Sequence, residues 1–102
     1  MNQIIEKINT IIENFDKAYG EWMDKKDYSL EDVMQIFKKH YYEFDDLYDY
    51  QGNPEENKLL DDILSWISDT VGEIYIDWGT DMQDYYNPGK ELRSYVEKFV
   101  QS

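Results

Sequence analysis

The sequence contains no cysteine, which excludes disulfide bonds, thiolate metal ligands and cysteine nucleophiles, and which fits a reducing compartment. Long hydrophobic runs are also missing. The opening segment MNQIIEKINTIIENF is interrupted by charged and polar residues such as Glu6, Lys7 and Glu13, so it predicts neither a signal peptide nor a membrane span. These absences lead us to expect a soluble, cytoplasmic protein.

Basic residues are scarce, with ten Lys and Arg against 23 Asp and Glu, and the formal net charge is -13. So large an excess of negative charge repels a phosphate backbone, which disfavours direct binding of DNA or RNA. The charge alone would suggest disorder, but 41% hydrophobic and 17% aromatic residues are enough to build a core. With 102 residues, we expect a single domain spanning residues 1–102.

The apolar pattern of the sequence is helical, because apolar residues recur every three or four positions. It predicts four helices, at about residues 3–24, 30–49, 54–78 and 90–100. Ser29 and Asn53 stand at capping positions before the second and third helices. The alternation in GEIYIDW also permits a short strand after Gly72, and residues 80–86 are predicted as a short helix or loop. The sequence therefore predicts an all-α, four-helix bundle-like domain.

Two positions on the predicted helices bear on packing. Gly20 lies inside the first helix, so either the helix is weakened there or a neighbour packs closely against the glycine. Val100 belongs to the apolar residues that define the last helix, and we expect it on the face that packs against the core.

The negative charge is concentrated in the middle of the chain. Residues 41–86 hold thirteen acids and only Lys58, a net charge of -12, whereas residues 1–40 carry -2 and residues 87–102 carry +1. A need for solubility explains the total negative charge better than it explains why that charge is concentrated in residues 41–86. The distribution therefore predicts one anionic surface.

The predicted binding surface combines acids with aromatic anchors. One acidic cluster lies at the end of the second helix. A second lies along the third helix, on the side away from its apolar face, where acids recur at steps of seven and four residues. Carboxylates one helical turn apart lie about 5 to 6 Å from each other, close to the spacing of phosphates in a nucleic-acid strand. Large aromatics among acids are typical of interfaces, although these aromatics can instead cover the core edge. The predicted partner-binding residues are Asp45, Asp46, Asp49, Tyr50, Asp62, Trp66, Asp69, Glu73, Asp77 and Tyr85.

Signs of catalysis or of a bound cofactor are lacking in the sequence. Paired carboxylates are so abundant that no pair stands out as a general acid and base. His40 lies three residues before Glu43, but two ligands do not make a metal site. The chain has no nucleophile motif, no glycine-rich phosphate loop and no calcium-binding loop. The sequence therefore predicts a protein that is not an enzyme and holds no metal or cofactor.

Two groups of inhibitors share features with this sequence. The segment HYYEFDDLYDY, followed by NPEENKLLDDILSWI, resembles the acidic, tyrosine-rich specificity region and the following helix of colicin-type nuclease immunity proteins. In charge, size and helicity the chain also resembles the phage nucleic-acid mimics that block restriction or CRISPR machinery. Both resemblances imply blockade of a basic active site without catalysis.

The expected function is that of a non-catalytic acidic inhibitor of the immunity or anti-defence type. Its partner would be a basic protein, either a nuclease toxin or a nucleic-acid-processing enzyme. The alternative is a structural or adaptor module that associates through an apolar helix face, with the charge serving solubility. The sequence leaves open whether the protein is a monomer or a homodimer.

Overall fold

The described part of the chain folds into four α-helices, as the sequence predicts. The computed structural model describes residues 3–27, 29–48, 53–77 and 88–101. In these residues the helices are α1 (Gln3–Lys25), α2 (Leu30–Asp45), α3 (Pro54–Asp77) and α4 (Pro88–Gln101), and there is no strand. The segment GEIYID is the end of α3, so the strand alternative is not adopted. The predicted short element at residues 80–86 lies outside the described residues.

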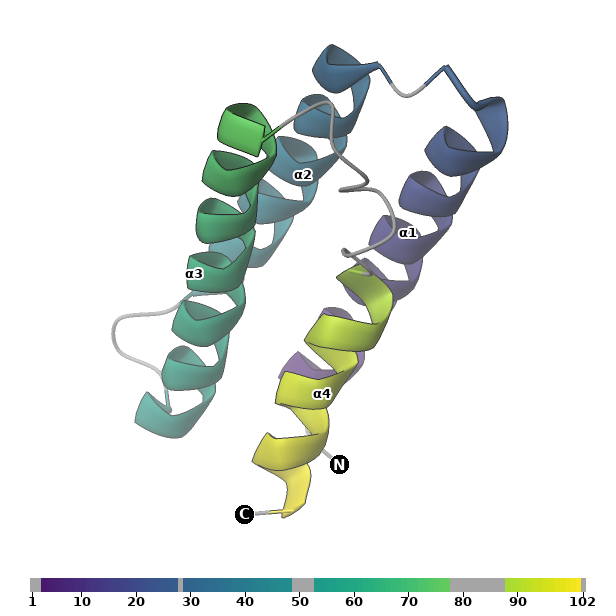
Figure 1. The fold of residues 1–102 in the computed structure, drawn as a ribbon. Coiled ribbons are helices and arrows are strands. Elements are labelled where there is room, and N and C mark those ends of the chain that lie inside the picture. Colours follow the sequence, from purple (N-terminus) through teal and green to yellow (C-terminus); the bar gives the residue numbers. More distant parts are fainter. Residues whose placement is uncertain (1–2, 28, 49–52, 78–87, 102) are drawn as a thin grey trace.

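The four helices form an up-and-down bundle. Consecutive helices run in opposite directions, so the two chain ends lie at the same end of the bundle (Figure 1). α1 and α3 each pack against both α2 and α4, which closes a ring around one core. The contact between α3 and α4 is the least extensive of the four. The bundle is elongated, with extents of 41 × 22 × 22 Å.

The junction between α1 and α2 is held by side-chain hydrogen bonds. α1 ends where Lys26 adopts a left-handed backbone conformation (φ 60°), which stops the helix. The indole N–H of Trp22 donates to the carbonyl of Ser29 at 3.0 Å, and this bond fixes the chain just before α2. The hydroxyl of Ser29 then accepts from the backbone N–H of Asp32 at 3.3 Å, so the predicted cap is confirmed.

α2 ends four residues earlier than the prediction of residue 49. After Asp45 the chain tightens: the N–H groups of Leu47 and Tyr48 donate to the carbonyls of Phe44 and Asp45, each at 3.0 Å. These bonds span three residues, as in a 3₁₀ turn. The last turn of α2 carries acids and no base, which the negative end of the helix dipole disfavours. The apolar pattern of the sequence continues past Asp45, so the predicted helix was too long.

The start of α3 is capped as the sequence predicts. The side-chain oxygen of Asn53 accepts hydrogen bonds from the backbone N–H groups of Glu55 and Glu56, at 2.8 and 3.3 Å. Pro54 opens the helix at a position where its missing N–H leaves no bond unmade.

α4 begins at Pro88, two residues before the predicted start, and its first turn lies close to α1. Gly89 is buried against the side chain of Asp16, and a Cβ added at Gly89 would lie 2.5 Å from the Cγ of Asp16. Arg93, one turn later, reaches the same carboxylate at 3.5 Å. Glycine is therefore the residue that allows α4 to approach α1 at this point.

The core is built from all four helices. Its largest fully buried side chains include Phe15 of α1, Phe37 and Phe44 of α2, Leu60 and Ile63 of α3, and Leu92 of α4. His40 of α2 is buried among them. Its Nδ1 donates to the carbonyl of Ile36 at 2.7 Å, and its ring stacks on Phe15 with the centroids 4.6 Å apart. His40 is thus a polar core residue with a backbone partner.

Two packing expectations are resolved by the structure. Val100 is 64% exposed, because in the last turn of α4 it is Phe99 that packs against the core. The expectation that Val100 faces the core is therefore wrong. Gly20 is exposed, and a Cβ added there would have nothing within 4 Å. Close packing does not explain this glycine, which leaves a locally weakened helix.

Candidate functional site

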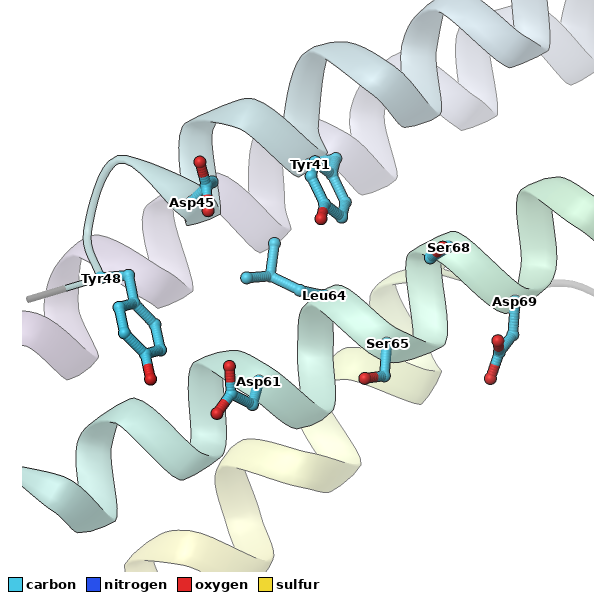
Figure 2. A pocket seen from close by; sticks show the side chains of 8 residues that line it. All are labelled: Tyr41, Asp45, Tyr48, Asp61, Leu64, Ser65, Ser68 and Asp69. Atoms are coloured by element: carbon cyan, nitrogen blue, oxygen red, sulfur yellow. The ribbon is translucent and has the colours of Figure 1, made fainter. Parts of the chain in front are cut away.

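A hollow of about 440 Å³ lies on the surface between the C-terminal end of α2 and the middle of α3 (Figure 2). We call it the acidic hollow. Its lining residues are Tyr41, Asp45, Tyr48, Asp61, Leu64, Ser65, Ser68 and Asp69.

Both helices supply these side chains through their helical periodicity. On α2, Tyr41 and Asp45 are one turn apart, and the turn that ends α2 brings Tyr48 to the same side. On α3, the steps from Asp61 to Ser65 and Ser68 follow one line along the helix. Leu64 points from α3 toward α2, as Figure 2 shows, and is 8% exposed. The acidic hollow therefore has an apolar residue on its inner side and acids around it.

The negative charge of the acidic hollow is not neutralised locally. Asp45, Asp61 and Asp69 are exposed, no lysine or arginine lines the hollow, and none of the three forms an ion pair with another described residue. Asp45 also ends α2, where the partial negative charge of the helix terminus adds to its own. The site is suited to attract a cation.

A second, smaller hollow of about 150 Å³ adjoins the first on the seam between α2 and α3. We call it the apolar hollow. Its lining residues are Lys38, Tyr41, Tyr42, Ile67, Ser68 and Val71, and Tyr41 and Ser68 also line the acidic hollow. Tyr42 is 63% exposed, and its ring meets that of Tyr41 edge to face at 5.7 Å between centroids. The two hollows together make one α2–α3 groove with an acidic end and an apolar end.

The predicted acids divide between two sides of α3. Asp45 and Asp69 both line the acidic hollow, although the charge of Asp69 also acts on Tyr95 of α4, and Asp46, the C-cap of α2, is exposed next to Asp45 in the chain. Asp62 instead lines a hollow of about 330 Å³ between α3 and α4, together with Tyr95 and Lys98 among other residues. Glu73 is exposed in the C-terminal half of α3. The predicted acids therefore occupy a wide band on the outer surface and do not form one cluster.

The field of the α3 acids reaches α4. Burial of the ring, and then the negative charges of Asp62, Glu91 and Asp69, raise the pKa of Tyr95 above 10.0. Burial and nearby anions both disfavour the phenolate. This shift is a local sign of negative potential on the α4 side of the acidic band.

Of the three predicted aromatic anchors, only Trp66 lies among the described residues. Trp66 is half-buried, packs against the core, and stacks with Phe37 at 6.3 Å between ring centroids. Only part of its surface is open to a partner, as for a residue at the core edge. Asp77 is the last residue of α3, and its side chain lies outside the described parts of the structure. Three further predicted residues also lie outside them: Asp49, Tyr50 and Tyr85.

Several residues of the acidic hollow were missed by the sequence analysis. Asp61, Ser65 and Ser68 recur at steps of four and three, a spacing that the predicted row from Asp62 to Asp69 bypassed. Tyr41 and Tyr48 fit the apolar pattern and are half-buried against the core, yet they also line the hollow. The spacing of Asp61, Ser65 and Ser68 was the available signal.

Among the described residues, no group of three or more His, Asp or Glu side chains is arranged to hold a metal ion. Nor does any described helix have the combined length and apolarity needed to cross a lipid bilayer. Comparisons of the chain with models of protein families, with curated proteins and with solved structures find no match. The function is therefore argued from the surface itself.

Proposed function

We propose that this chain is a non-catalytic acidic inhibitor that binds a basic active site or nucleic-acid-binding site on a partner protein. The binding surface would be the outer face of α2 and α3, which we call the acidic surface. Its described acids are Asp45, Asp46, Asp61, Asp69 and Glu73, whereas Asp62 lies on the α4 side of α3. The observation that carries the proposal is the acidic hollow, which three carboxylates line and no lysine or arginine does.

Electrostatics supports this role more than a role in folding. Like charges one turn apart on a helix destabilise it, and acids at a helix C-terminus do the same. The first-turn acids of α2 and α3 complement the helix dipole, but the acids at the end of α2 and the like-charged pair Asp69 and Glu73 of α3 weaken the isolated fold. On approach to a basic cleft the same charges attract the partner over long range and speed association, and they are neutralised in the complex.

Aromatic rings would add binding energy beside the charge. Tyr41, Tyr42 and Tyr48 lie along the α2–α3 groove, and tyrosine is enriched among residues that dominate binding free energy. A guanidinium or ammonium group placed over a tyrosine ring also gains a cation–π interaction. These features favour a partner that presents Arg or Lys side chains, such as a nuclease toxin or another nucleic-acid-processing enzyme.

The adaptor alternative receives no specific support from the described surface. That function needs a contiguous apolar patch, but Tyr42 and Val100 are the only exposed large hydrophobic side chains among the described residues. They lie on different helices, α2 and α4.

The proposal is tested by affinity capture with charge-matched variants. The bait is the wild-type chain, a surface variant (Asp45→Asn, Asp61→Asn, Asp69→Asn) or a control variant (Glu13→Gln, Glu21→Gln, Asp24→Asn). The control removes the same charge from exposed positions of α1. Circular dichroism checks that all three baits keep their helix content. Captured proteins are then eluted with a DNA or RNA oligonucleotide.

The expected result is a basic protein held at physiological salt by the wild type and the control but not by the surface variant. Elution by the oligonucleotide would indicate competition for one basic site, since phosphates and carboxylates would bind the same groups. If the surface and control variants lose the partner equally, net charge alone is responsible. Loss by neither variant would show that the acidic surface is not used.

A further inference from the structure

The α2–α3 groove differs from a general anionic surface because its two ends differ in chemistry. The acidic hollow holds Asp45, Asp61 and Asp69, whereas Tyr42, Ile67 and Val71 are among the residues of the apolar hollow. The apolar hollow, which Lys38 and Ser68 line together with the tyrosines and aliphatic residues, has a volume of about 150 Å³ and room for one aliphatic or aromatic side chain, since a cavity of about that volume holds benzene. Charge alone does not account for this second hollow.

The distance between the outermost lining residues of the two hollows sets the widest spacing of matching groups on a partner, and Asp69 lies nearer, between Ile67 and Val71 along α3. Along α2, Lys38 in the apolar hollow and Asp45 in the acidic hollow are seven residues apart. Along α3, Val71 and Asp61 are ten residues apart. At about 1.5 Å per residue these separations are roughly 10 to 15 Å. On a partner helix the same distance is about two to three turns.

We propose that the α2–α3 groove holds a basic amphipathic helix of the partner, with an apolar side chain in the apolar hollow and Arg or Lys in the acidic hollow. Charge complementarity selects the basic end, and a seam between two antiparallel helices is a surface on which a third helix packs. This inference rests on the proposed function, because it names the part of the partner that the acidic surface recognises.

The probe is a synthetic alanine-based helical peptide. It carries one leucine and, two to three turns away on the same face, three arginines, and it exceeds the roughly 12 to 15 residues that an isolated helix needs. One comparison peptide replaces the leucine by alanine. A second keeps every charge but has a central proline, which breaks the helix. Binding is followed by backbone amide chemical shifts of the full chain at physiological salt.

We expect the leucine peptide to shift the amides that line the α2–α3 groove and to bind about tenfold more tightly than either comparison peptide. The decisive protein variants are Asp61→Asn and Asp62→Asn, which are adjacent, exposed and equal in charge. Only Asp61 lines the groove. Asp61→Asn should weaken binding about fivefold, as for one ion pair at roughly 4 Å in water, and Asp62→Asn should leave it unchanged. Tyr42→Ala should weaken it, whereas Val100→Ala should not.

Several results overturn the inference. Equal binding of the proline peptide would indicate an extended basic tail as the occupant. Equal losses for Asp61→Asn and Asp62→Asn would indicate a diffuse charge effect, and shifts elsewhere, or none, would show that the groove is not the site. None of these results touches the proposed function, which depends on the affinity capture described above.

Discussion

The two pairs of helices in this bundle differ in charge: α1 and α4 are nearly balanced, whereas α2 and α3 are strongly acidic. α1 and α4 together contain seven acidic and six basic residues, whereas α2 and α3 contain eleven acidic and three basic residues. α1 and α4 each have an acid in the first turn and a lysine in the last, which complements the helix dipole. α2 and α3 have acids in the first turn and no base in the last.

The difference in charge between the two pairs is not matched by a difference in core packing. All four helices contribute fully buried side chains to one core, so the two pairs do not differ in their part in packing. The acid excess of α2 and α3 is therefore not required to hold them in place. The acids at the C-terminal helix ends work against the fold, and binding to a basic partner, as proposed above, would offset that cost.

The largest expected effect comes from the core that joins the two pairs. Phe15 of α1 is fully buried, meets Phe37 edge to face at 4.9 Å between centroids, and stacks on His40. Phe15→Ala should lower the free energy of unfolding by about 3 to 5 kcal/mol, because it leaves a cavity between α1 and α2. Chemical denaturation measures this loss, and the exposed Val100→Ala should change it by less than about 0.5 kcal/mol. Faster hydrogen exchange in α1 and α4 alone would mean that the pairs unfold separately.

A smaller effect is expected where α4 meets α1. Gly89→Ala would place a methyl group against the side chain of Asp16, so either that side chain or α4 must shift, at a cost of about 1 to 3 kcal/mol. The matched control is Gly20→Ala, where the methyl group meets open space and the substitution should stabilise α1 by up to about 1 kcal/mol. Opposite changes in thermal midpoint for these two variants are the expected result. A stabilised Gly89→Ala variant would contradict the close approach.

The charge comparison is tested at the helix ends. Asp45→Asn and Asp46→Asn remove acids from the end of α2, where the dipole disfavours them, and each should stabilise the protein by about 0.3 to 1 kcal/mol. Glu91→Gln removes an acid from the first turn of α4 and should destabilise it by a similar amount. Both effects should shrink in high salt, which screens exposed charges. If all three variants lose stability, the acids of α2 serve the fold after all.

Much of the fold could be predicted from the sequence because it depends on local patterns. The period of three and four, together with Ser29 and Asn53, predicts four helices and the starts of two of them, and the structure confirms both caps. The end of α2 was wrong because the apolar period continues through Tyr48, while the backbone has already turned at Asp46.

The groove was harder to predict because it depends on how the helices are rotated against each other. Asp61 and Asp62 are neighbours in the sequence, but one faces α2 and the other faces α4, since adjacent positions on a helix differ by about 100°. Composition identified the acid-rich region, and only the packing of α3 between α2 and α4 places the neighbours Asp61 and Asp62 on different sides.

The smallest expected effect is a pH dependence at Tyr95, where the field of α3 crosses to α4. Its pKa is raised above 10.0 by burial and by Asp62, Glu91 and Asp69, so the folded state keeps the phenol proton more tightly than the unfolded chain. The contribution of Tyr95 to stability is therefore fully present below pH 10 and is lost as the pH rises above it. Tyr95→Phe should remove this part of the loss of stability at alkaline pH, as chemical denaturation at several pH values measures.

The source of the pKa shift is tested by NMR titration of the tyrosine ring carbons. Asp62→Asn should lower the pKa of Tyr95, with Asp61→Asn as the charge-matched comparison. If Asp61→Asn lowered the pKa of Tyr95 more than Asp62→Asn did, the negative potential at Tyr95 would not come from the side of α3 that faces α4.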